Sequence, residues 1–539
     1  MFDFIKRARL HREGLSCGRY RRTTAQGEFQ EALHCHPFVG VAFFVLTGGA
    51  TVLLLRLLSH NLPWPPNDGQ TVFLSAVFIT ATVHWYLGLG KTHKNRDVLL
   101  TFGTIALQLM AVALMLEYGG SRWSPGFALL LAPHALAPVM LCMLGGRPLG
   151  LYATVYATLL GASMMQDADA LKFVAVGLSV GFISVFASQN VRKRSRLITC
   201  GFYAGLTATL YMVLFSQMEA AFGPESQWFM LGAPLLCGIL STMIAGALLP
   251  ALESVFKVTT DISWLELADL NHPLMKRLSL EAPGTYHHSL MVANLSEAAA
   301  ESIGANPGMC RVCSYFHDIG KLTKPEYFIE NLGTEENPHD DLTARMSALV
   351  LIAHVKDGVD LALKHGLNRR IIEVIEQHHG TSLVYFFYRR ALEQKNEIIR
   401  LVEQDKARED DVPEVTEDGF RYPGPKPQSK EAAIISLADS VESASRTIGK
   451  PTPSRVEQLV DDIVRNRVLD GQLDECDLTL AQIALIKDSF VKTLLSMMHS
   501  RIRYPKEHTE KDAEAEQAKQ AREPESSATT KAAQVSNAA

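Results

Sequence analysis

Charged residues are scarce over one long part of this sequence. The chain has 52 Lys and Arg and 57 Asp and Glu, yet only 18 of them lie between Pro37 and Ala251. The chain average of 20% charged residues and a net charge of −5 hides this division. A soluble domain of such length needs more charge on its surface. The sequence therefore joins a membrane part to a soluble part, and its near-neutral balance argues against a basic nucleic-acid-binding surface spread over the whole chain.

Apolar runs of about 20 residues, the length that spans a hydrocarbon core, fill the charge-poor part. Lys and Arg gather in alternate loops and before the first run, which predicts cytoplasmic termini and an even number of spans. The fifth and sixth runs have a very short connector and could instead form one re-entrant hairpin. We therefore predict a multi-pass protein of a bacterial inner (cell) membrane with about eight helices: 37–59, 71–90, 98–118, 125–145, 149–166, 170–189, 197–217 and 228–251.

Titratable residues are nearly absent from the middle of these runs, where only His84 and His134 occur. Ion and proton paths use chains of such groups, so the sequence disfavours a transporter, and each His is more simply a neutral group bonded to a neighbouring helix. Cysteine is also rare, with eight scattered residues, and a disulfide framework is not expected. Cys310 and Cys313 form a lone C-x-x-C, which indicates two buried helix positions, with a metal or redox role as the alternative.

Helical periodicity dominates the charged part of the chain, and strand-like alternation is scarce. The sequence therefore predicts an all-α fold, with a polytopic helical membrane domain followed by a cytoplasmic all-α domain. The expected organisation is a basic cytoplasmic N-terminus (1–36), a transmembrane region (37–251) whose last seven spans form one unit (71–251), a coupling linker (252–283), the helical domain (284–504) with a loop insertion (403–428), and a disordered tail (505–539).

Histidine and aspartate concentrate in this helical domain, at His287-His288, His317-Asp318, His354, His378-His379 and Asp439. Taken singly, each His is more simply a surface or hydrogen-bonded residue, and a second His-Asp pair at His339-Asp340 lies in a polar loop. His317-Asp318 instead ends an apolar helical run and should face the interior, where an unpaired charge costs several kcal/mol. If one His of the His287-His288 pair is counted, these positions offer five His and two Asp, which jointly indicate a metal site.

Imidazole and carboxylate ligands suit Mn, Fe, Zn or Ni rather than calcium. Seven candidate ligands exceed what one ion holds, and a carboxylate such as Asp318 can bridge two ions. Paired divalent ions about 3.5–4 Å apart serve phosphoester hydrolysis, because they activate a water and hold the non-bridging oxygens. The pattern therefore predicts a two-metal hydrolase for an anionic phosphate substrate.

These residues lie in longer stretches that resemble a known family, the HD-domain metal-dependent phosphohydrolases, and more closely its seven-transmembrane type, the PgpH-like cyclic-di-AMP phosphodiesterases. The resemblance covers about residues 37–500. It is carried by Glu-Ala-Pro-Gly-Thr-Tyr-His-His-Ser-Leu-Met-Val-Ala-Asn from Glu281, His-Asp-Ile-Gly-Lys from His317, Phe-Ile-Glu-Asn from Phe328, Ala-His-Val-Lys-Asp-Gly from Ala353, Glu-Gln-His-His-Gly-Thr from Glu376, Tyr-Pro-Gly-Pro-Lys-Pro from Tyr422 and Leu-Ala-Asp-Ser-Val-Glu from Leu437.

The resemblance implies hydrolysis of cyclic di-AMP to linear pApA, which controls the level of a second messenger, with two divalent transition-metal ions, Mn or Fe, as cofactors. It implies the cyclic dinucleotide and the lipid bilayer as partners, no nucleic acid polymer, and leaves self-association open. His317, Asp318 and Lys321 would be catalytic, and Asn337, His339 and Asp340 would contact substrate. The implied metal ligands are His288, His317, Asp318, His354, His378, His379 and Asp439, with His287 only a neighbour.

One departure from the family concerns the interval between the first two spans. Family members usually carry a large extracytoplasmic domain there, whereas this chain has only His60 to Gln70, so any regulation is expected through the spans, the lipid or the basic N-terminus. Two alternatives stay open: an HD hydrolase of another nucleotide (cyclic di-GMP, cGAMP or a dNTP), and a nucleotide-binding membrane receptor without turnover. An HD-GYP enzyme is disfavoured, because Gly380-Thr381-Ser382 follows the double His in place of Gly-Tyr-Pro.

Overall fold

The fold is known from a computed structural model of the chain. It describes residues 37–58, 68–89, 95–120, 125–165, 167–189, 191, 195–215, 227–256, 258–332, 337–406, 408–448 and 452–499. Within these residues the regular structure is helical throughout, and the one β contact is an isolated bridge between Leu383 and Arg421. The all-α prediction is therefore confirmed. The predicted basic N-terminus, the tail and several Lys- and Arg-rich loops lie outside the described residues.

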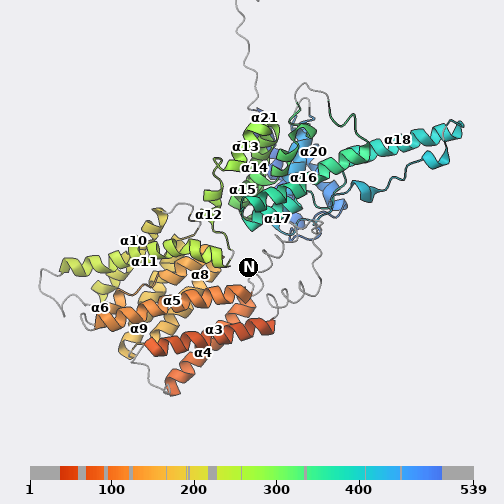
Figure 1. Ribbon diagram of the computed structural model, residues 1–539. Coiled ribbons are helices and arrows are strands. Elements are labelled where there is room, and N and C mark those ends of the chain that lie inside the picture. Colours follow the sequence, from red (N-terminus) through yellow and green to blue (C-terminus); the bar gives the residue numbers. More distant parts are fainter. Residues whose placement is uncertain are drawn as a thin grey trace, which may run out of the picture. The chain divides into compact units, whose positions relative to one another are not determined.

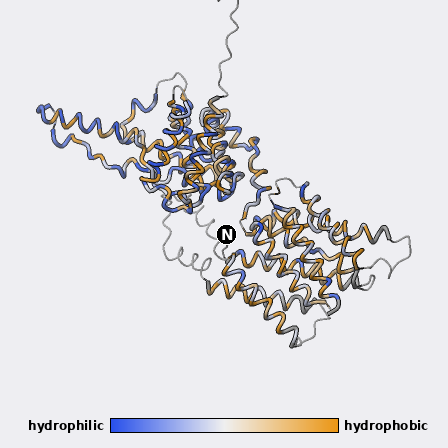
Figure 2. The backbone as a smooth tube through the Cα atoms, turned by 180° about the vertical axis from the view of Figure 1, so that it is seen from behind, coloured by the Kyte–Doolittle hydropathy of each residue, from blue (hydrophilic) through white to orange (hydrophobic). Residues whose placement is uncertain are grey.

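The helices of the charge-poor part are strongly apolar along their length (Figure 2). Five of them are long and apolar enough to cross a bilayer: Val72–Leu89, Asp97–Leu116, Asp169–Ala187, Ser195–Leu214 and Leu231–Phe256. These helices support a membrane protein, while the number of eight spans stays a prediction. In chain order (Figure 1) the elements are α3 (Pro37–Leu58), α4 (Asp68–His84), the π-helix η1 (Trp85–Leu89), α5 (Asn95–Gly120), α6 (Pro125–Leu130), α7 (Leu136–Gly145), α8 (Arg147–Ala162), α9 (Asp167–Ala187), α10 (Ser195–Leu214) and α11 (Gln227–Phe256).

The fourth predicted span, 125–145, is not one helix, so the expectation of a continuous segment there is wrong. Helix α6 ends at Leu130 and α7 begins at Leu136. Pro133 lies between them and has no N–H to continue a helical ladder. Two buried side chains satisfy backbone groups at the break: His134 Nε2 donates to the Leu129 carbonyl at 3.0 Å, and Gln108 Oε1 accepts from the Ala137 N–H at 2.8 Å. Internal partners of this kind make a broken helix tolerable among membrane helices.

The charged part folds into shorter helices, most of which begin at a side-chain cap. Asn306, Asn368, Ser429 and Thr452 each accept a hydrogen bond from an N–H of the first turn, as expected for residues that favour this position. The helices are α12 (Asp261–Leu267), α13 (Pro273–Glu281), α14 (Pro283–Ile303), α15 (Pro307–Phe316), α16 (Ala344–Lys364), α17 (Arg369–Gln377), α18 (Tyr385–Glu403), α19 (Lys430–Ser445), α20 (Pro453–Leu469) and α21 (Leu480–His499).

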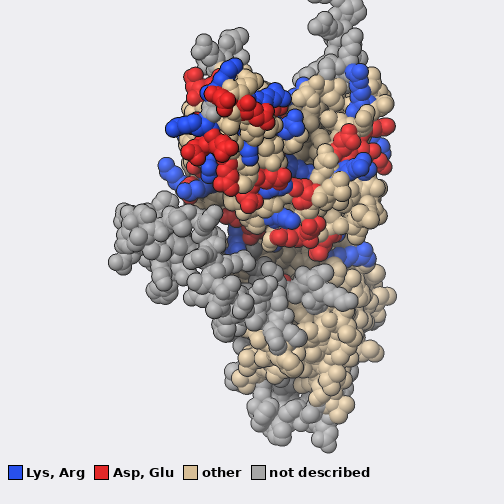
Figure 3. Space-filling model, turned by 90° about the vertical axis from the view of Figure 1, so that its right-hand side faces the viewer, with Lys and Arg blue, Asp and Glu red and all other residues tan. Residues whose placement is uncertain are grey.

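Short 3₁₀ turns complete this part of the chain: η3 (Ile319–Thr323), η4 (Pro325–Tyr327), η5 (Glu409–Asp411) and η6 (Glu417–Phe420). The last two lie in the irregular segment between α18 and α19. Figure 3 shows Lys, Arg, Asp and Glu mixed over the surface of these C-terminal helices, whereas the membrane helices present mainly uncharged residues. The surfaces of the two parts thus differ in charge as the sequence predicts.

Helix α19 is largely buried in the C-terminal part. From Ala432 to Ala438 every residue is buried, because α15, α17, α20 and α21 all pack against this helix. The chain divides into two compact units, Met1–Pro283 with Ile319–Pro325 and Ala353–Gly366, and Gly284–Asp318 with Glu326–Ile352 and Leu367–Ala539. Helix α16 is continuous across this division.

Candidate metal centre

A histidine is the C-cap residue of both α15 and α17. His317 is the C-cap of α15 and His378 is the C-cap of α17, and both are completely buried. In each ring Nδ1 donates to the carbonyl three residues earlier, at 2.7 Å from Ser314 O and 2.9 Å from Ile375 O. A carbonyl can only accept, so Nδ1 carries the proton and the lone pair of each neutral ring is on Nε2. Both helix ends thus aim an imidazole lone pair inward.

A first cluster comprises His288, His317, Asp318 and Asp439, whose ligand atoms all lie within 4.8 Å of one another. None of the four residues is more than 6% exposed. The Nε2 atom of His288 lies 3.0 Å from Asp439 Oδ1 and 3.6 Å from Asp318 Oδ2. The Nε2 atom of His317 lies 3.3 Å from Asp318 Oδ2 and 3.8 Å from Asp439 Oδ1. Four donor atoms from α14, α19 and the end of α15 therefore surround one point.

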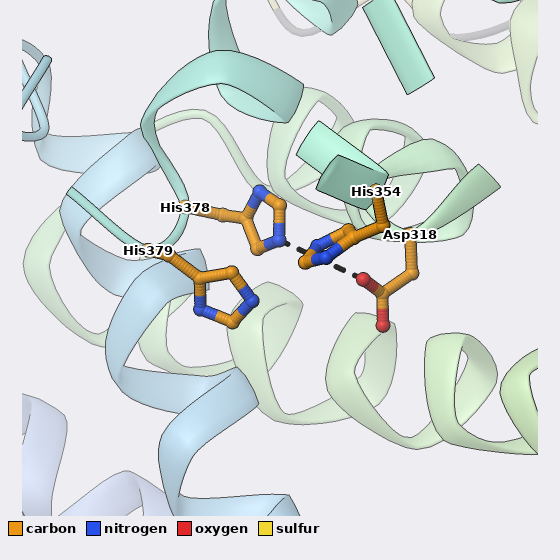
Figure 4. Close-up of side chains that lie close together, drawn as sticks. All are labelled: Asp318, His354, His378 and His379. Carbon is orange, nitrogen blue, oxygen red and sulfur yellow. Dashed lines mark ion pairs between the residues drawn. The ribbon is translucent and has the colours of Figure 1, made fainter. Parts of the chain in front are cut away.

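A second cluster comprises Asp318, His354, His378 and His379, again with ligand atoms within 4.8 Å of one another. Figure 4 shows the four side chains pointing toward one another. His378 Nε2 lies 3.6 Å from Asp318 Oδ1. His379 is the most accessible member, with 18% of its side chain exposed, whereas the other three are buried. Asp318 belongs to both clusters: its Oδ2 atom faces the first cluster and its Oδ1 atom faces the second.

The carboxylates govern the electrostatics of the first cluster. Burial alone would lower the pKa of His317, but the carboxylates of Asp318 and Asp439 outweigh burial and raise this pKa to about 10. Burial would likewise raise the pKa of Asp439, but the facing His288 and His317 rings hold it well below its usual value. The Nε2 atom of His317 makes no hydrogen bond of normal geometry within the described residues. A buried polar atom in this position needs a partner, and a cation shared with the carboxylates would provide one, so the residues fit a metal ion.

Comparisons with known proteins agree with this geometry. Residues 285–444 match the HD domain, and residues 69–260 match the family described as a 7TM receptor with intracellular HD hydrolase. The chain belongs to the seven-transmembrane HD family. HD domains bind divalent metal ions, and the HD match spans all seven predicted ligands.

Two curated relatives of this seven-transmembrane HD protein are named cyclic-di-AMP phosphodiesterase PgpH. The relative from Bacillus subtilis (strain 168) is 34% identical over 84% of this chain, and the relative from Listeria monocytogenes serotype 1/2a is 33% identical over 84%. The chain spans 62% and 61% of their lengths. A crystal structure of the L. monocytogenes PgpH HD domain, solved also in complex with cyclic-di-AMP, is 43% identical and covers 42% of this chain and 100% of the crystallised chain, with a TM-score of 0.38.

A glycine allows one close approach inside the HD domain. Gly320, two residues after Asp318, lies so near to α16 that a Cβ atom on it would be 1.8 Å from the carbonyl oxygen of His354. Real Cβ atoms do not approach backbone oxygen so closely, so only glycine permits this packing. The Gly of His-Asp-Ile-Gly-Lys therefore sets the position of the backbone that carries His354.

The Phe-Ile-Glu-Asn stretch of the HD domain anchors the start of the helix that carries His288. Asn331 Oδ1 accepts from the Thr285 N–H at 3.0 Å, and Thr285 Oγ1 lies 3.1 Å from Glu330 Oε1. Gly284 provides the space, because a Cβ atom there would lie 1.8 Å from the Glu330 carbonyl oxygen. These residues orient the first turn of α14, on which His288 is buried and His287 is exposed.

The four non-ligand residues expected at the site lie outside both clusters. Lys321 is half-buried on η3. Asn337 Oδ1 accepts from the His339 N–H at 3.1 Å, and the buried His339 donates from Nε2 to the Tyr327 carbonyl at 2.8 Å. Asp340 is exposed and lies 4.0 Å from Arg390. The contacts of Asn337 and His339 hold their own loop together, and a substrate-binding role for these residues stays a prediction.

The sequence prediction of the site did not include two side chains that contact the predicted ligands. The Tyr422 ring stacks on His379, with ring centroids 4.3 Å apart and planes 28° apart. Glu442 is hydrogen-bonded to His288 Nδ1. The signal for Glu442 was its spacing, because a residue three positions after Asp439 on a helix shares its face. The family stretch that begins at Tyr422 pointed to this irregular segment, but no local signal placed the Tyr422 ring against His379, which is far away in sequence.

Proposed function

We propose that this chain is a membrane-anchored, metal-dependent phosphodiesterase that hydrolyses cyclic di-AMP to pApA and so controls the level of a second messenger. The observation that carries the proposal is the pair of buried His/Asp clusters joined through Asp318. Two adjacent cation sites are the usual arrangement for phosphoester hydrolysis. The names of the relatives support a cyclic dinucleotide, and the adenine base in particular, as the substrate.

The donor atoms favour two divalent transition-metal ions, Mn or Fe. His288, His317, Asp318 and Asp439 would hold one ion, and Asp318, His354, His378 and His379 would hold the other. Nitrogen and oxygen ligands without thiolate suit these metals. When bound, the ions would supply Lewis acidity toward phosphoryl oxygens and a reactive water at neutral pH. Two carboxylates against two divalent cations leave the centre with a net positive charge, which favours an anionic phosphodiester.

The protein side chains orient the site and define its open side. His317 and His378 are locked by their Nδ1 hydrogen bonds, so both present Nε2 without rotation. The accessible His379, with Tyr422 stacked on it, marks the direction from which substrate reaches the buried ligands. Lys321, Asn337, His339 and Asp340 are the proposed further contacts to the phosphate or base.

We place the HD domain on the cytoplasmic side of a bacterial inner membrane. The alternation of Lys- and Arg-rich loops in the sequence supports this orientation. The lipid bilayer is then the second partner of the chain, and self-association stays an open prediction.

The direct test uses the purified full-length chain in detergent, with Mn²⁺ or Fe²⁺ added and products separated by chromatography. Cyclic di-AMP, cyclic di-GMP, cGAMP and dGTP are offered in parallel. We expect cyclic di-AMP to be hydrolysed fastest, with pApA as the product, and His317→Ala to be inactive while still inserted in the membrane. Preferred turnover of dGTP or cyclic di-GMP would overturn the substrate, and tight nucleotide binding without turnover would favour a receptor.

A further inference from the structure

Glu442 is a buried carboxylate that neither cluster uses as a ligand. It lies on α19, one turn after Asp439, and is only 5% exposed. Burying a carboxylate is costly unless it is hydrogen-bonded and paired with an opposite charge. The two groups that Glu442 contacts are therefore informative about its role.

The first contact of Glu442 is His288. The Nε2 atom of His288 faces the first cluster, 3.0 Å from Asp439 Oδ1, while its Nδ1 atom is hydrogen-bonded to Glu442 Oε2. Both ring nitrogens therefore face a carboxylate, and an ionised carboxylate can only accept. If Nε2 gave its lone pair to a metal ion shared with Asp439, Nδ1 would carry the remaining proton and donate it to Glu442. In that state His288 would have the same tautomer as His317 and His378.

The position of His288 explains why a side chain is needed. His317 and His378 cap their helices and find a backbone carbonyl for Nδ1. His288 instead lies inside α14, which runs from Pro283 to Ile303, and carbonyls within a helix are already used by the helical ladder. A carboxylate from another helix takes the place of the carbonyl.

The second contact of Glu442 is Arg446, the C-cap residue of α19, one turn further along the chain. Arg446 Nε donates to both oxygens of Glu442, at 2.9 and 3.1 Å, and its terminal nitrogen lies 2.9 Å from Oε1. The guanidinium compensates the buried charge and holds the carboxylate in place. Asp439, Glu442 and Arg446 therefore form a row on one face of α19 that ends at the metal centre.

We propose that Glu442 is a positioning residue for His288: it favours the tautomer with the proton on Nδ1 and the lone pair on Nε2, raises the basicity of Nε2, and is itself oriented by Arg446. The inference rests on the proposed role of His288 as a metal ligand. Carboxylates that accept from the second nitrogen of a metal-binding His typically contribute 10- to 100-fold to metal affinity.

The test measures metal binding to the metal-stripped full-length chain, with Mn²⁺ as the probe, by titration calorimetry. We expect Glu442→Ala to weaken one of two binding events about 10- to 100-fold and to leave the other unchanged. Glu442→Gln keeps an acceptor oxygen for Nδ1 but loses the charge, so its affinity should lie between those of Glu442→Ala and the unsubstituted chain. Turnover in both variants should recover at saturating Mn²⁺ without a change in KM.

Glu431→Gln is the matched control, because Glu431 lies on the same helix and bonds the Asn306 N–H at 3.1 Å, away from both clusters. Unchanged Mn²⁺ affinity in a folded Glu442→Ala protein would overturn the inference, and so would an equal loss in Glu431→Gln. An unsubstituted chain that binds no Mn²⁺ would overturn the metal role of His288 as well. Two tight Mn²⁺ sites without hydrolysis of cyclic di-AMP would instead contradict only the proposed function.

Discussion

Asp318 Oδ1 lies 3.6 Å from Nε2 of His378, while the other oxygen of the same carboxylate faces the first cluster. The two residues lie on different helix ends, and their approach joins two four-residue clusters through a single side chain. A carboxylate that serves two cations cannot be replaced by an amide without loss, because an amide offers one oxygen and no charge.

Asp318→Asn is therefore expected to reduce the number of tightly bound Mn²⁺ ions from two to at most one. Hydrolysis should fall by more than roughly 100-fold, since loss of a direct ligand exceeds the 10- to 100-fold effect of outer partners. Calorimetry gives the stoichiometry, and chromatography of the products gives the rate. Asp340→Asn, in the second His-Asp pair, is the control and should keep both ions, because Asp340 is exposed and belongs to neither cluster. Two retained ions in Asp318→Asn would contradict a bridging role.

Metal binding should release protons. The pKa of His317 is raised to about 10 by the facing carboxylates, against the effect of burial, so the metal-free chain holds this proton at neutral pH. Metal ligands must be deprotonated. The apparent Mn²⁺ affinity should therefore rise with pH up to about 10, by roughly tenfold per pH unit for each proton released.

Calorimetry at pH 7.5 in buffers with different ionisation enthalpies measures this release directly. We expect at least one proton per chain when both ions bind. His317→Ala should release fewer protons, and its affinity should depend less on pH. Binding with no proton uptake by the buffer would mean that His317 is already neutral and that its carboxylate neighbours do not act as described.

Gly320→Ala should destabilise the HD domain and displace His354. The added Cβ would lie 1.8 Å from a backbone oxygen, which cannot rotate away, and overpacking of this kind costs about 1–3 kcal/mol or more. Thermal unfolding and Mn²⁺ titration of the same preparation report the two effects. Gly419→Ala serves as the control, since nothing lies within 4 Å of its added Cβ. Equal melting temperatures for the two variants would refute the close packing of η3 on α16.

Gln108→Leu should weaken the membrane part, because the Ala137 N–H at the break between α6 and α7 would lose its acceptor. A buried unsatisfied N–H costs about 1–3 kcal/mol. Unfolding of the full chain in mixed detergent measures the change. Thr207→Val provides the comparison, since the Thr207 hydroxyl is exposed and bonds only the Tyr203 carbonyl of its own helix. A loss no greater than in Thr207→Val would show that the break needs no cap from Gln108.

Several features followed from local sequence. Helical periodicity predicted an all-α chain, charge depletion predicted a membrane part, and the structure and the family matches confirm both. The end of α15 at Phe316, just before His317-Asp318, also agrees with the expected apolar run. Helix periodicity, helix caps and charge depend on residues close together in sequence, so they can be recognised in the sequence without a tertiary structure.

The continuous fourth span was expected for the same local reason, and it failed for a tertiary one. Residues 125–145 are apolar throughout, and the single Pro133 does not by itself end a membrane helix. What makes the break stable is an acceptor on another helix, Gln108, 29 positions away from Ala137. A partner that distant leaves no trace in the local pattern.

The sequence by itself determined that the chain has a helical membrane part. It also determined that the helical domain after it carries five His and two Asp for which no simple structural role was apparent. Only the tertiary structure decided how they meet. It divides the predicted ligands into two clusters that share Asp318, supplies His288 with Glu442 from 154 positions further along the chain, and leaves His379 as the most accessible of the predicted ligands. The physical reason is that spacing along a helix determines which side chains share a face, whereas the packing of separate helices determines which atoms of those side chains approach one another.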